Sequence, residues 1–145
     1  MISGVAVVDA SLVVEYLVEL RFAREATRFF AGLLAPDADL ELWAPDLVYP
    51  EAVSALRKLV RLRAIGAEAG KRAVERLVRL PLVTTGTAGL MMEAWRMRDS
   101  VTPYDACYLA LASRLRAPLV TADRRLSRVR ATGVARVVFV GDVEP

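Results

Sequence analysis

The sequence predicts an α/β fold, a three-layer sandwich in which helices flank a central, mainly parallel sheet of about four to five short strands. Short apolar runs without polar alternation recur along the chain, as in strands that are buried on both faces. Helical segments separate these runs, and strands that alternate with helices are typical of parallel sheets. No repeat, low-complexity tract or linker interrupts the pattern, so we expect a single domain over residues 1–145.

The first third of the chain predicts two strands and two helices. Residues 5–8 (V-A-V-V) form a strand that Asp9 ends, and Ser11 can cap a helix over residues 12–18. The expected elements that follow are a helix over 21–34, a turn at 36–39 and a strand over 40–43.

The middle of the chain predicts three helices and one strand. Pro45-Asp46 opens a long helix that reaches about Ile65, with Pro50 and Glu51 in its early part and Gly66 at its end. The remaining expected elements are a helix over 67–80 with Ala73, Val74, Leu77 and Val78 facing inward, a strand over 82–84 and a helix over 87–97.

Residues 102–123 predict a buried helix followed by a strand. Thr102 can cap the helix, and Pro103 suits its first turn, where no N–H is needed. The side chains from 106 to 112 are small or apolar on every face, which indicates burial. Pro118 stops the helix, and the strand over 119–121 follows. A last strand is expected over 137–140, with a short tail to residue 145.

The composition excludes several classes of protein and site. The sequence has no histidine, which excludes Ser-His-Asp and Cys-His catalysis and most zinc or copper sites. Cys107, the single cysteine, lies within the buried helix and is expected to serve packing. The longest uncharged run, residues 80–92, is too short to span a membrane. The first residues contain no basic n-region and no cleavage site, so we expect no signal peptide. We therefore expect a cytoplasmic protein.

Basic residues gather in two stretches, although the net charge is only +3. Residues 57–79 contain eight basic and two acidic side chains, and a second group directly follows Asp123. Such clusters either bind phosphate backbones or form solvated helix faces, and the sequence leaves both interpretations open. The candidate RNA-binding residues are Arg57, Lys58, Arg61, Arg124 and Arg125.

Four acidic residues are candidates for one site. Asp9 and Asp123 follow two strands, at the carboxyl edge where parallel sheets place their functional crevice. Glu51 and Asp105 lie near helix starts, which can face the same edge. Each acid also has a structural explanation, as a cap, a turn residue or a surface residue. Together, however, the four can converge.

Converging carboxylates need a counter-charge. With no histidine and no thiolate cluster, oxygen ligands favour a hard cation, Mg²⁺ or Mn²⁺. A carboxylate-held ion of this kind activates water and neutralises charge on a phosphate, so the implied chemistry is phosphodiester hydrolysis with one ion or two.

At these residues the chain resembles the PIN domain family, and within it the VapC-type toxins of bacterial and archaeal toxin–antitoxin pairs. The matching segments are V-V-D-A-S at 7–11, P-E-A-V-S-A-L at 50–56, Y-D-A-C-Y-L-A-L-A at 104–112 and L-V-T-A-D-R-R-L at 119–126.

The resemblance implies a PIN-like fold and a metal-dependent endoribonuclease toxin with a four-acid centre. The implied catalytic and metal-binding acids are Asp9, Glu51, Asp105 and Asp123. Thr121 matches a hydroxyl position beside the last acid and joins the implied catalytic residues, Ser11 matches a small polar position, and Asp99 matches none. The family also implies a homodimer, a small antitoxin that covers the groove, and specific tRNA or rRNA targets that one sequence does not reveal.

Other functions fit the sequence less well. The turn after the first strand is D-A-S, with no G-x-G-x-x-G, and there is no P-loop. A receiver domain would need a lysine after a late strand, but Lys58 and Lys71 are the only lysines. The alternative of a different class is a non-catalytic module that binds RNA or a protein through its basic helices. Apolar residues on the helices over 12–34 and 47–65 exceed what a small monomer needs, which also favours a dimer.

Overall fold

The computed structural model describes Ile2, residues 4–129 and residues 136–143. Its elements, in chain order, are β1 (Gly4–Val8), α1 (Ala10–Val18), α2 (Ala23–Leu34), β2 (Leu40–Pro45), α3 (Val48–Arg61), α4 (Ala67–Leu77), β3 (Leu82–Thr85), η1 (Ala88–Leu90), α5 (Met91–Arg96), α6 (Pro103–Leu115), β4 (Leu119–Thr121), α7 (Arg124–Ser127), β5 (Val137–Phe139) and η2 (Val140–Asp142). The α/β class and the parallel sheet are confirmed.

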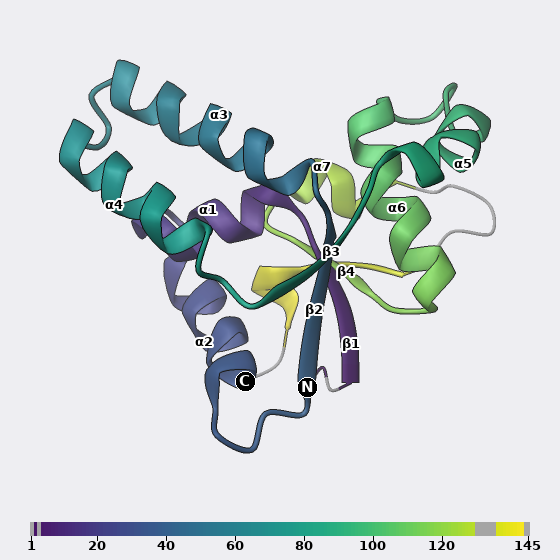
Figure 1. The fold of residues 1–145 in the computed structure, drawn as a ribbon, viewed down its shortest axis with the longest axis horizontal. Coiled ribbons are helices and arrows are strands. Elements are labelled where there is room, and N and C mark those ends of the chain that lie inside the picture. Colours follow the sequence, from purple (N-terminus) through teal and green to yellow (C-terminus); the bar gives the residue numbers. More distant parts are fainter. Residues whose placement is uncertain (1, 3, 130–135, 144–145) are drawn as a thin grey trace.

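The described strands form one sheet in the order β3-β2-β1-β4-β5, and every neighbouring pair is parallel. Helices α1 to α4 lie on one side of the sheet, and α5 and α6 lie on the other (Figure 1). The first strand therefore occupies the centre, between β2 and β4. Because all strands run the same way, their carboxyl ends meet at one edge.

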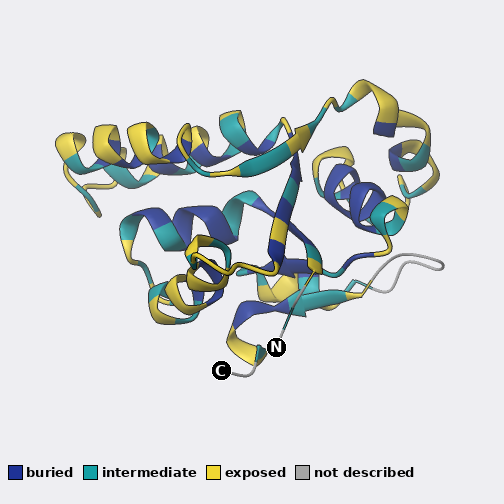
Figure 2. Cartoon of the chain, turned by 60° about the horizontal axis from the view of Figure 1, so that its bottom comes forward, coloured by how far each residue is buried: buried dark blue, intermediate teal, exposed yellow. Residues whose placement is uncertain are grey.

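The core fills the space between the sheet and the helices. Ala6, Val7 and Val8 of β1 have no exposed surface, as expected for a strand that is covered on both faces. All residues from 106 to 112 of α6 are buried, which confirms the prediction that this helix is buried. Figure 2 shows the buried positions in the middle of the molecule and the exposed ones on the outer helix turns. No helix in the described part of the chain has the length and hydropathy needed to cross a membrane.

The structure corrects the predicted ends of α1 and α2. Asp9 caps α1, because its side chain accepts a hydrogen bond from the Leu12 N–H, whereas the sequence suggested Ser11 as the cap. The following helix begins at Ala23, two residues later than predicted.

The long helix of the middle region is shorter than predicted. It covers Val48–Arg61 and not residues 45–65, because Arg63 takes a left-handed conformation (φ 58°) and turns the chain. Gly66 does not end this helix but lies at the start of α4. Gly70 matters for the packing of α4 against α3, since a Cβ there would lie 2.9 Å from Val60 Cγ2. Helices α3 and α4 can thus approach closely.

Two further predictions about helices were wrong in part. Helix α4 ends at Leu77, so Val78 leaves the buried face and is 66% exposed. The helix predicted over 87–97 is a short 3-10 turn, η1, followed by α5. Residues 130–135 and 144–145, which include part of the predicted tail, lie outside the described residues.

Candidate metal-dependent active site

The candidate site lies at the carboxyl ends of β1 and β4, the two strands at the centre of the sheet. Val8 is paired with Val120, so the residues that follow the two strands are neighbours. Asp9 comes directly after β1, and Asp123 follows β4 by two residues and caps α7. This register brings together two side chains that are 114 positions apart in the sequence.

Asp9 is 6% exposed and fully engaged in hydrogen bonds. Its Oδ1 accepts from the Ser11 hydroxyl at 2.8 Å and from the Leu12 N–H at 3.1 Å, and its Oδ2 accepts from the Thr121 hydroxyl. Burial raises the pKa of Asp9 from 3.8 to about 6, although these hydrogen bonds oppose the shift. The charge of Asp123 adds to the increase in this pKa.

Two hydroxyl groups connect Asp9 to the chain after β4. The Ser11 hydroxyl accepts from the Ala122 N–H at 3.1 Å and lies 3.2 Å from Thr121 Oγ1. In turn, Thr121 Oγ1 accepts from the Asp123 N–H at 2.9 Å. Ser11 therefore fastens the β1–α1 turn to the β4–α7 turn.

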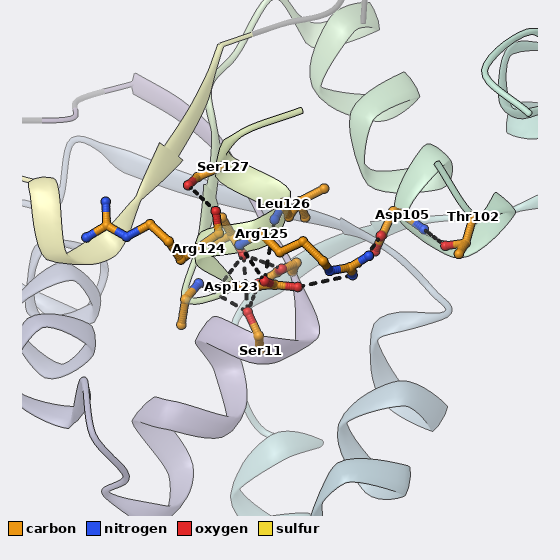
Figure 3. Close-up of polar contacts among 11 residues, drawn as sticks. Ser11, Thr102, Asp105, Asp123, Arg124, Arg125, Leu126 and Ser127 are labelled. Carbon is orange, nitrogen blue, oxygen red and sulfur yellow. Dashed lines mark hydrogen bonds and ion pairs between the residues drawn. The ribbon is translucent and has the colours of Figure 1, made fainter. Parts of the chain in front are cut away.

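Asp105 and Asp123 share one cation, the guanidinium of Arg125. Its Nη2 lies 3.4 Å from Asp105 Oδ2 and 3.3 Å from Asp123 Oδ2 (Figure 3). Asp105 is in the first turn of α6, where its N–H donates to the capping Thr102 hydroxyl. Burial raises the pKa of Asp105, Arg125 opposes this shift, and the charge of Asp123 adds to it.

Glu51, on the first turn of α3, accepts a 2.7 Å hydrogen bond from the Tyr108 hydroxyl. Tyr108 is buried in α6, and burial raises its pKa far above the ordinary value, so its hydroxyl stays protonated and donates. Burial also raises the pKa of Glu51, the Tyr108 hydrogen bond lowers it, and the charge of Asp105 raises it. The sequence interpretation missed Tyr108, although it is the one hydroxyl within the apolar run 106–112 and lies one turn after Asp105.

The four acids thus form a row. The charge of Asp105 raises the pKa of Glu51, and the charge of Asp123 raises the pKa values of Asp105 and Asp9. Within the described residues, however, no three acidic or cysteine side chains lie where they could hold one metal ion. The donors are all oxygens and suit Mg²⁺ or Mn²⁺, but the side chains would have to move, and Arg125 would have to leave Asp105 and Asp123. Cys107 is buried, and burial raises its pKa, as expected for a packing residue.

The candidate RNA-binding residues fall into two sets. Arg57, Lys58 and Arg61 line a groove of about 560 Å³ along α3, which begins at Glu51 and includes Ser54. Arg124 and Arg125 instead make contacts within the chain. Arg124 pairs with Asp142 at 3.0 Å and stacks on the Phe139 ring. The unassigned Asp99 is exposed between α5 and α6.

Comparison with known proteins agrees with this geometry. A family model of the PIN domain matches residues 6–131. Ribonuclease VapC9 of Mycobacterium tuberculosis is 38% identical over 121 residues, which cover 83% of this chain and 87% of VapC9. Ribonuclease VapC3 of the same organism is 34% identical over 122 residues, which cover 84% of this chain and 85% of VapC3.

Solved structures share the fold at low sequence identity. VapC20 of M. tuberculosis, a sarcin-ricin loop cleaving toxin, superposes with a TM-score of 0.63 at 18% identity, covering 84% of this chain and 92% of VapC20. VapBC2 of Rickettsia felis, solved with a DNA fragment from its promoter, gives a TM-score of 0.64 at 12% identity, covering 93% of this chain and 98% of the matched one.

The chain therefore belongs to the PIN domain family. Its relatives by sequence place it, within that family, among the VapC-type toxin ribonucleases.

The raised pKa of Asp9 predicts a specific pH dependence in EDTA. The folded pKa of about 6 exceeds the ordinary 3.8, so the folded chain binds an extra proton between these values. This contribution to stability is complete below about pH 4 and is lost as the pH rises through about 6. Relative to Asp9→Asn, the wild type should therefore lose up to about 3 kcal/mol of unfolding free energy between about pH 4 and 7.

Urea denaturation across this pH range measures the difference between the two proteins. Asp99→Asn, at an exposed aspartate, is the matched control and should follow the wild type at every pH. A constant gap between wild type and Asp9→Asn would contradict the prediction.

A second prediction concerns the hydrogen bond between Tyr108 and Glu51. Tyr108→Phe should lower the unfolding free energy by about 1–2 kcal/mol, since a partly buried carboxylate loses its donor. It should also raise the pKa of Glu51 further, because the hydrogen bond that lowers this pKa is gone. Carboxyl-carbon NMR titration and urea denaturation measure the two effects. Tyr104→Phe, at a residue that is 59% exposed, is the control. Equal changes in unfolding free energy and in the pKa of Glu51 in both variants would contradict the role of the Tyr108–Glu51 hydrogen bond.

Proposed function

We propose that this protein is a metal-dependent endoribonuclease, the toxin of a type II toxin–antitoxin pair, which hydrolyses RNA phosphodiester bonds at Asp9, Glu51, Asp105 and Asp123. The observation that carries the proposal is the row of four interacting carboxylates at the carboxyl edge of the sheet. The relatives named as VapC ribonucleases support it.

The same four carboxylates would hold Mg²⁺ or Mn²⁺. When bound, such an ion activates water and neutralises charge on the phosphate. Thr121 and Ser11 orient Asp9 through their hydroxyls, and Tyr108 orients Glu51. Because burial raises the pKa of Glu51 toward the working pH, Glu51 suits proton transfer better than an exposed carboxylate would.

The groove along α3 supports the proposal that the substrate is RNA. Arg57, Lys58 and Arg61 are exposed and line it from the Glu51 end outward. In the part of the chain that the structure describes, none of the three forms an ion pair, so their charges are free to meet phosphates. We propose that this groove holds the RNA backbone beside the scissile bond.

We propose further that a small antitoxin binds this chain and that the chain forms a homodimer. The solved VapBC2 and a toxin–antitoxin complex from Klebsiella pneumoniae share its fold, which supports an antitoxin partner. Large apolar side chains on the surface, among them Leu62, Met92 and Trp95, support self-association. A single domain over residues 1–145 in the cytoplasm is part of the same proposal.

The direct test is RNA cleavage by the purified protein. With a pool of tRNA and rRNA, cleavage should require Mg²⁺ or Mn²⁺, stop in EDTA, and fall at least about 100-fold in Asp105→Asn, because a carboxylate ligand is lost. Asp99→Asn should cleave like the wild type. Circular dichroism checks that each variant is folded.

One outcome would contradict the proposed nuclease function. If neither metal supports cleavage and Asp105→Asn still binds RNA like the wild type, the protein is a non-catalytic binding module.

The groove gives a separate prediction about affinity. In an Asp105→Asn background, which prevents cleavage, Lys58→Ala with Arg61→Ala should weaken binding of single-stranded RNA by about tenfold, because two phosphate contacts are lost. The slope of log K against log salt should fall by about 1.4 for the same reason. Fluorescence anisotropy of a labelled RNA measures both. Lys71→Ala with Arg72→Ala, two exposed cations on α4, is the control, and equal losses in both pairs would contradict the role of the groove.

A further inference from the structure

The positively charged side chain of Arg125 lies between two acids of the candidate site. Its Nη2 is shared by Asp105 and Asp123, which come from α6 and from the β4–α7 turn. In the described part of the chain, it is the one cationic side chain that forms an ion pair with either carboxylate. The carboxylate side chains are 22% and 34% exposed, whereas the Arg125 side chain is 74% exposed.

The neighbouring arginine shows that this contact is not a general property of the segment. Arg124 and Arg125 point in opposite directions from α7, and only Arg125 reaches Asp105 (Figure 3). Arg124 forms an ion pair with Asp142, and its guanidinium lies over the Phe139 ring. The two adjacent arginines therefore form ion pairs with different acids.

The local geometry allows the Arg125 side chain to leave without disturbing the fold. Its backbone N–H donates to Asp123 Oδ1 at 2.8 Å, so the main chain of α7 remains anchored when the side chain moves. The guanidinium contacts themselves are long, at 3.3 and 3.4 Å, and mostly in solvent. Exposed ion pairs of this kind are weak and exchange easily.

The two carboxylates cannot bind Arg125 and a divalent ion through the same oxygens. Asp105 Oδ2 and Asp123 Oδ2 both face the guanidinium, and a cation at these atoms would need their lone pairs and would be repelled by the guanidinium charge. Without either cation, the two acids would repel each other.

We propose that Arg125 is an internal counter-ion of the metal-free site, which holds Asp105 and Asp123 until a divalent cation displaces it. The inference rests on the proposed metal-dependent function. Arg125 thus sets the metal affinity of the site by competition. It is a positioning residue for the two carboxylates and is separate from the groove of α3.

Mn²⁺ binding to the whole protein without RNA tests the proposal. By isothermal titration calorimetry, Arg125→Gln should bind Mn²⁺ about fivefold more tightly than the wild type, because the competing cation is gone, while Arg125→Lys should remain near the wild type. In EDTA, Arg125→Gln should unfold at a lower temperature than the wild type, and saturating Mn²⁺ should remove this difference.

Arg128→Gln is the matched control, since it removes one exposed positive charge after the same short helix. An equal gain of affinity in Arg128→Gln would overturn the proposal, because the effect would then reflect net charge. Equal affinity of Arg125→Gln and wild type would overturn the role of Arg125 alone. The absence of Mn²⁺ binding in every protein would overturn the proposed metal-dependent function as well.

NMR of the arginine side chains gives a reading in the unmutated protein. Addition of diamagnetic Mg²⁺ should shift the Nε–Hε signal of Arg125 and leave that of Arg124 in place. An unmoved Arg125 signal at saturating Mg²⁺ would overturn the displacement.

Discussion

The pairing of β1 with β4 is the constraint on which the candidate site depends. These strands are far apart in the sequence, and their register places Asp9 beside Thr121, whose hydroxyl donates to Asp9 Oδ2. The same carboxylate caps α1 through Leu12. One buried side chain therefore ends a strand, starts a helix and joins two strand ends. A change in the register of β1 against β4 would remove the hydrogen bond from Thr121 and separate the two strand ends.

The balance of charge at this edge is the second constraint. Four carboxylates interact in a row, three of them with raised pKa values, and Arg125 supplies positive charge to only two. Such an arrangement costs folding free energy, since burial disfavours the ionised forms. Proteins tolerate this cost where a ligand of opposite charge relieves it, which is consistent with a cation site at the carboxyl edge of a parallel sheet.

The sequence predicts the sheet and the acids well because both depend on local patterns. Apolar runs such as residues 5–8 and 119–121 are typical of buried strands, and Asp9 and Asp123, one and two residues after them, therefore lie at the same edge. The helix ends were harder to predict. The left-handed turn at Arg63 and the exposed position of Val78 just after α4 follow no pattern that a single window of residues encodes. The hydrogen bond of Tyr108, the ion pairs of Arg125 and the link from Ser11 to Ala122 were not predicted, because each joins residues on different elements.

The late position of β4 in the chain has a consequence for synthesis. Asp9 is made among the first residues, but the hydroxyl and the acid that complete its surroundings, Thr121 and Asp123, are among the last. A nascent chain on the ribosome lacks them until most of the protein has been translated, and before that point β1 has no neighbour on the β4 side. The candidate site is therefore incomplete until β4 and the residues that follow it have been made, so its assembly is a late step in the synthesis of the chain.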